Sequence, residues 1–68
     1  MLWDELEATL KALPTYFGHS VEQCYEDGTT YRVSVWLTSG AGLDVKTYIV
    51  RTQLTDAGRE VVGYKAIL

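Results

Sequence analysis

The sequence is short of the residues that hold small folds together covalently or through a metal. Its 68 residues include one cysteine (Cys24), one histidine (His19) and one proline (Pro14). A single cysteine cannot close an intramolecular disulfide, and without a Cys/His cluster the chain lacks the ligands of a structural zinc site. We therefore expect a fold stabilised by packing alone, and the unpaired thiol favours a reducing, cytoplasmic location.

Long hydrophobic runs are also missing. No window approaches eighteen uncharged apolar residues, so we expect no membrane-spanning helix and no membrane partner. The first residues, Met1 to Glu5, contain no basic segment followed by an apolar run, which argues against a secretory signal.

Size and charge indicate a single small domain, residues 1–68. The composition is 47% hydrophobic and 22% charged, which is typical of globular chains. A core below about 70 to 80 residues rarely supplies more than about 3 to 5 kcal/mol, so a second copy or another protein is expected to add stability. The net charge is -3, but residues 1–31 hold six acids and one base, whereas residues 32–68 hold three acids and five bases.

The start of the chain has helical periodicity. Leucines at positions 2, 6, 10 and 13 fall on one helical face and predict an amphipathic helix over about residues 3–13. Asp4 followed by Glu7 has the spacing of a capping box, and Pro14 predicts the helix end.

Beyond the helix the apolar period is two, which predicts strands at about residues 20–25, 29–38 and 43–54. A three-residue loop over residues 26–28 would place Val21 on the same face as Val33 and keep Glu22 off it. A five-residue link over residues 38–42 would pair Leu37 with Leu43 and Val35 with Val45.

The last segment, about residues 59–68, fits a fourth strand better than a helix, because Gly58, Gly63 and two adjacent valines disfavour a helix. Residues 56–64, an acidic-Gly turn followed by Val-Val-Gly-Tyr, resemble the last hairpin of PAS sensor domains, and this resemblance implies a hairpin. A four-residue loop would then line Val62, Tyr64, Ala66 and Leu68 up beside Ile49, Thr47 and Val45. The predicted fold class is α+β, one N-terminal helix on a four-stranded antiparallel meander, with an α-β-β-β-α order as the alternative.

The sequence offers little for catalysis. His19 is expected in an exposed connector and Cys24 as a half-buried thiol, while cap and turn roles account for the paired carboxylates. The loop over residues 39–42 has no Lys-Ser/Thr pair and no following helix, so it makes no phosphate cradle. We expect no enzyme activity, no cofactor and no metal.

The candidate site is the second face of the sheet. Its predicted members form an exposed apolar patch rimmed by cations. The expected partner-binding residues are Arg32, Trp36, Lys46, Tyr48, Val50 and Lys65.

These features predict a small non-enzymatic protein-interaction module. In size and acidity the chain resembles the inhibitors that phages and mobile elements direct against host machinery, anti-CRISPR proteins among them. Two alternatives remain open: a nucleic-acid-binding module that uses the basic and aromatic face, against which the overall acidity argues, and a subunit of a structural homodimer or larger homo-oligomer.

Overall fold

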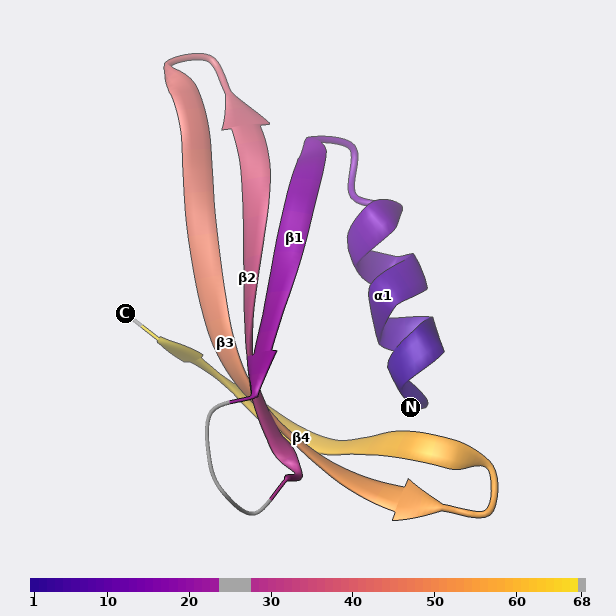
Figure 1. Cartoon of the computed structure of the whole chain (residues 1–68). Helices are drawn as coiled ribbons and strands as arrows, with labels where there is room; N and C mark the ends of the chain where they lie inside the picture. The colour runs from indigo at the N-terminus through magenta and orange to yellow at the C-terminus, as the bar shows by residue number, and fades with distance from the viewer. Residues whose placement is uncertain (24–27, 68) are drawn as a thin grey trace.

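The computed structural model describes residues 1–23 and 28–67, which form one helix and one four-stranded antiparallel sheet (Figure 1). The strands follow one another in the sheet in the order β1-β2-β3-β4. This arrangement confirms the predicted α+β meander, and the strand at the C-terminal end excludes the helical alternative. The elements are α1 (Trp3–Lys11), β1 (Tyr16–Gln23), β2 (Thr30–Ser39), β3 (Gly42–Thr55) and β4 (Gly58–Ile67).

The ends of α1 differ from the prediction. Leu2 is the N-cap residue, and the Glu5 carboxylate accepts the Leu2 backbone N–H at 2.9 Å. The predicted cap formed by Asp4 and Glu7 is therefore wrong, since Asp4 already lies in the first turn. The helix ends at Lys11, two residues earlier than predicted, because residues 12–15 form the tight connection into β1.

The first hairpin has the predicted register. Val21 pairs with Val33 and Gln23 with Tyr31, and Gly28 has the left-handed φ of 73° that the predicted turn requires. β1 begins at Tyr16, four residues earlier than expected, so the anticipated connector up to His19 is mostly strand. The predictions for Cys24, Tyr25, Glu26 and Asp27, and the one for Leu68, lie outside the described residues.

The second hairpin has a register one residue away from the prediction. Ser39 pairs with Gly42 across a two-residue turn instead of a five-residue link, so Val35 lies opposite Lys46 and Leu37 opposite Asp44. A shift of one residue moves every side chain of a strand to the other face. Lys46, Tyr48 and Val50 consequently lie on the face toward α1, not on the second face.

The third hairpin contains a β-bulge. Thr55 pairs with Gly58 and Thr52 with Val61, but the register then shifts by one residue at Val62. Tyr64 and Ala66 therefore lie opposite Val50 and Tyr48, not opposite Ile49 and Thr47 as predicted. Tyr64 and Ala66 still face α1, and Val61 faces α1 as well.

The core lies between α1 and the centre of the sheet, where Val33, Val35 and Val50 are buried. In Figure 1, α1 runs beside β1 and the β3–β4 hairpin folds beneath its N-terminal end. The Val61 N–H donates to the Met1 carbonyl at 2.7 Å, and the Trp3 ring lies 5.3 Å from that of Tyr31. These contacts attach the first turn of α1 to the sheet.

Candidate functional site

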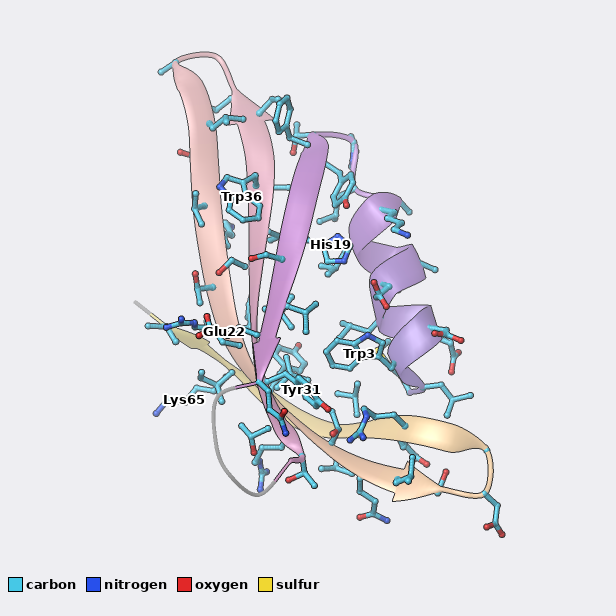
Figure 2. All side chains as sticks on the ribbon, viewed as in Figure 1. Trp3, His19, Glu22, Tyr31, Trp36 and Lys65 are labelled. Carbon is cyan, nitrogen blue, oxygen red and sulfur yellow. The ribbon has the colours of Figure 1, made fainter. Side chains whose placement is uncertain are left out.

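The face of the sheet that points away from α1, here called the open face, is not covered by any other helix or strand of residues 1–23 and 28–67. Figure 2 shows Trp36, Glu22 and Lys65 on this side, and Trp3, Tyr31 and His19 on the side toward the helix. Cross-strand pairing places these residues on it: Ser20, Glu22, Arg32, Ser34, Trp36, Leu43, Val45, Thr47, Ile49, Arg51, Lys65 and Ile67.

One end of the open face is apolar. Trp36 on β2 pairs directly with Val45 on β3. Leu43 precedes Val45 by two residues on β3 and lies on the same face. Leu43 is 51% exposed, Val45 54% and Ile67 48%. Contiguous exposed apolar side chains of this kind mark interaction surfaces in soluble proteins.

The middle of the open face is a shallow hollow. Ser20, Ser34 and Thr47 form one cross-strand row, and the hydroxyls of Ser34 and Thr47 lie 3.1 Å apart. Their short side chains leave a depression of about 510 Å³ between the apolar end and the charged end.

The other end is charged. Arg32 forms an ion pair with Glu22 on the neighbouring strand, and Lys65 lies in the same cross-strand row. The Arg51 guanidinium lies over Gly63, where a Cβ atom would be only 2.9 Å from its Nη2. Glu22, Arg32, Arg51 and Lys65 give this end of the face a net charge of +2, opposite in sign to the whole chain.

The structure divides the six predicted partner-binding residues between two faces. Arg32, Trp36 and Lys65 lie on the open face, whereas Lys46, Tyr48 and Val50 face α1. Val50 is buried in the core, and Tyr48 stacks edge to face with Tyr64 at 6.1 Å. Leu43, Val45 and Ile49 lie on the open face in their place, so this face is still apolar and cationic although three of its six predicted members lie on the other face.

A second surface lies on the opposite side, between α1 and strands β2 to β4, and is here called the helix-side groove. It has a volume of about 600 Å³, and Lys46 is the one charged side chain among its lining residues. Its rim is apolar and exposed, since Tyr64 is 73% and Val62 50% accessible. Leu6, Leu10 and Leu13 of the helix segment form one wall, and Val33, Val35 and Val50 form the floor.

His19 is not the exposed connector residue that the sequence suggests. It lies in β1, and its side chain is only 12% exposed. The Tyr16 hydroxyl donates to Nδ1 at 2.6 Å, and Nε2–H donates to the Glu7 carboxylate at 3.0 Å, an assignment of the tautomer that satisfies both nitrogens. Because His19 bonds to Tyr16 in its own strand and to Glu7 in the helix, the cluster is a link between α1 and β1.

Among the described residues, no group of three or more His, Cys, Asp or Glu side chains could hold a metal ion. In the same part of the chain, no helix is long and apolar enough to cross a membrane. Comparisons of the chain with protein families, curated proteins and solved structures find no match.

Proposed function

We propose that this protein is a non-enzymatic interaction module that binds another protein through its open face. The observation that carries the proposal is the uncovered apolar end, where Trp36 pairs with Val45 and where Leu43, Val45 and Ile67 are exposed. Tryptophan and arginine are the side chains most enriched among residues that dominate binding energy. Trp36 is therefore the proposed anchor of the interface.

The charges of the open face indicate what kind of surface it binds. The charged end of this face has a net charge of +2, whereas the whole chain has a net charge of -3. This difference orients the molecule so that the open face approaches an acidic surface first. The cross-strand partner Glu22 holds the Arg32 guanidinium in place. The complementary partner surface has an apolar centre and acidic groups at its edge.

The same charges favour a protein over a nucleic acid. Nucleic-acid affinity comes largely from phosphate contacts made by many cations, and the open face has three, one of them paired with Glu22. Lys46 and Tyr48, which would have extended a basic and aromatic platform, lie on the other side of the sheet.

The test compares binding by surface variants after the partner has been recovered from nuclease-treated lysate and purified. Replacing Leu43 and Val45 by serine removes exposed apolar area from the open face and should weaken binding by about tenfold or more. Leu54→Ser is the matched control, because Leu54 is exposed and lies near the β3–β4 turn on the side toward α1. Equal binding by the double variant and the control would contradict the proposal, as would recovery of nucleic acid alone.

A further inference from the structure

We propose that the partner of the open face binds through an extended segment, which pairs antiparallel with residues 42–46 of β3 and so adds a strand to the sheet. This inference rests on the proposed function and specifies which part of the partner the apolar end receives. The recognised chemistry is an extended peptide backbone whose side chains alternate in a defined way.

The beginning of β3 has a neighbouring strand on one side only. β3 starts at Gly42, but its pairing with β4 reaches only as far as Thr47, which lies opposite Ile67. Within residues 1–23 and 28–67, no other strand lies on that side of residues 42–46. In Figure 1 the far end of β4 points away from β3, and β3 continues with β2 beside it. An open edge of this kind is a template for pairing with another chain.

The backbone groups at this edge belong to Leu43 and Val45. Because Ser39 and Gly42 pair across a two-residue turn, they exchange hydrogen bonds, and bonded pairs alternate along an antiparallel ladder. Leu43 and Val45 therefore direct their N–H and C=O groups away from β2. The Thr52 N–H, further along β3, points to the β2 side, as this alternation requires. Donors and acceptors at this spacing match those of a second extended peptide.

The side chains beside this edge favour an apolar-basic-apolar segment. Leu43 and Val45 are 51% and 54% exposed on the open face, so apolar residues placed opposite them would extend the apolar end. Asp44 lies between them on the other side of the sheet, is exposed, and forms no ion pair within residues 1–23 and 28–67. The residue opposite Asp44 forms a close, non-hydrogen-bonded pair with it, so a lysine or arginine is favoured there.

The same alternation disfavours a second copy of this chain as the occupant. Two identical antiparallel strands pair about a two-fold axis, and the register that uses both edge residues puts Leu43 opposite Val45 of the other copy. That register places Asp44 directly opposite Asp44, where like charges are destabilising. A register centred on either edge residue loses bonds, because it reaches into the turn or to Thr47, which already pairs with β4.

The other edges of the sheet are paired or interrupted. Leu2 bridges Glu60 on the outer side of β4, and the bulge at Val62 interrupts that strand further along. β1 runs beside α1 and has a register shift between Tyr16 and Gly18 (Figure 1). Covering segments and bulges are the usual protection of sheet edges. Residues 42–46 pair with β2 without a register shift and adjoin the apolar end of the open face.

The test uses the blocked synthetic peptide Ac-Thr-Val-Lys-Val-Thr-NH2, titrated to millimolar concentration into the full chain and followed by NMR. The amide signals of Leu43 and Val45 should shift, and these amides should exchange with deuterium about threefold or more slowly when most of the protein is bound, because they become donors. The same peptide with aspartate in place of lysine should bind about threefold or more weakly, since it places like charges opposite Asp44.

A backbone variant tests the hydrogen bonds themselves. Val45→Pro removes one outward N–H and keeps an apolar side chain, and proline is tolerated at an edge whose N–H faces solvent. It should weaken peptide binding by about tenfold or more, whereas Val45→Thr keeps the N–H and should change the affinity by less than about threefold. Circular dichroism should show the same sheet content in both variants. The amide measurements use the wild-type chain and decide the question even where Val45→Pro lowers stability.

Amides of Leu43 and Val45 that do not change at millimolar peptide would overturn the proposal, as would equal peptide binding by Val45→Pro and Val45→Thr. Either result, together with loss of the recovered partner protein by the Leu43/Val45 serine variant, would leave the proposed function standing without the added strand. Partner binding that the serine variant does not weaken would overturn the proposed function itself.

Discussion

His19 Nε2 lies 3.0 Å from the Glu7 carboxylate and so joins the middle of α1 to β1 across twelve residues of sequence. The Tyr16 hydroxyl donates a hydrogen bond to the other ring nitrogen, Nδ1, at 2.6 Å. Because the helix has little buried apolar area to hold it, a partly buried polar link of this kind contributes a large share of its attachment.

Breaking this link should therefore loosen α1. His19→Ala and Glu7→Ala should each lower the free energy of unfolding by about 1 to 2 kcal/mol, since each leaves a partner without its hydrogen bond. The double variant should lower the free energy of unfolding by less than the sum of the two single losses. A double-mutant cycle measured by urea denaturation should give a coupling energy of about 1 kcal/mol. Additive losses would mean that the two side chains do not interact.

The first turn of α1 depends on Trp3. Its ring is 5.3 Å from that of Tyr31, and the Arg59 guanidinium lies 5.3 Å from the same Tyr31 ring. Trp3→Ala should lower the unfolding free energy by about 2 to 3 kcal/mol, because a half-buried tryptophan loses most of its packing. The matched control is Phe17→Ala, since Phe17 is an exposed aromatic and should cost less than about 0.5 kcal/mol. Equal losses would contradict the packing role of Trp3.

The β3–β4 turn requires glycine at position 58, where φ is 121°. Gly58→Ala should destabilise the protein by about 1 kcal/mol or more, because an L side chain is strained in that conformation. Gly18→Ala is the control: a Cβ there meets no atom within 4 Å and φ is not positive. Thermal unfolding that ranks the two variants in the opposite order would argue against this turn geometry.

Binding through the open face should depend on its charge. Lys65→Glu changes the net charge of the charged end of that face from +2 to 0 and should slow association with an acidic partner severalfold, while dissociation changes less. Lys11→Glu changes the net charge of the chain by the same amount, but Lys11 is exposed on α1, away from the open face. This variant should therefore slow association less. Association rates at two salt concentrations would measure both effects. A larger effect of Lys11→Glu would place the binding surface elsewhere.

The sequence predicts those parts of the fold for which only one arrangement buries apolar side chains without also burying a charged one. The β1–β2 register follows because the alternative would bury Glu22 opposite Val33, and Gly28 supplies the left-handed turn residue. The helix follows from the spacing of its leucines.

The β2–β3 register could not be obtained in the same way. β3 has apolar side chains at both alternations, Leu43, Val45 and Ile49 on one and Tyr48 and Val50 on the other, so burial alone favours neither. The tight turn between Ser39 and Gly42 decides it. The bulge at Val62 lies beside Gly63, and an isolated glycine within a strand is the one sequence signal that could have indicated it. This bulge is the reason that the predicted partners of Tyr64 were wrong.

Half of the candidate site was affected by that one-residue shift. Arg32 and Trp36 were placed correctly because they lie on β2, whose alternation is clear, whereas the members on β3 exchanged faces. The His19 link was missed because it joins residues far apart in the sequence, and no periodic pattern marks such a pair.

Partner binding is assigned to the open face of the sheet, and hydroxyl-radical footprinting of the purified chain, with and without its recovered partner protein, tests that assignment most directly. We expect Leu43, Val45 and Trp36 to be oxidised in the free protein and protected when the partner is added, while Tyr64, which is exposed on the other side of the sheet, is oxidised equally in both states. Undiminished oxidation of Trp36 in the complex would contradict the central claim that the open face is the binding surface.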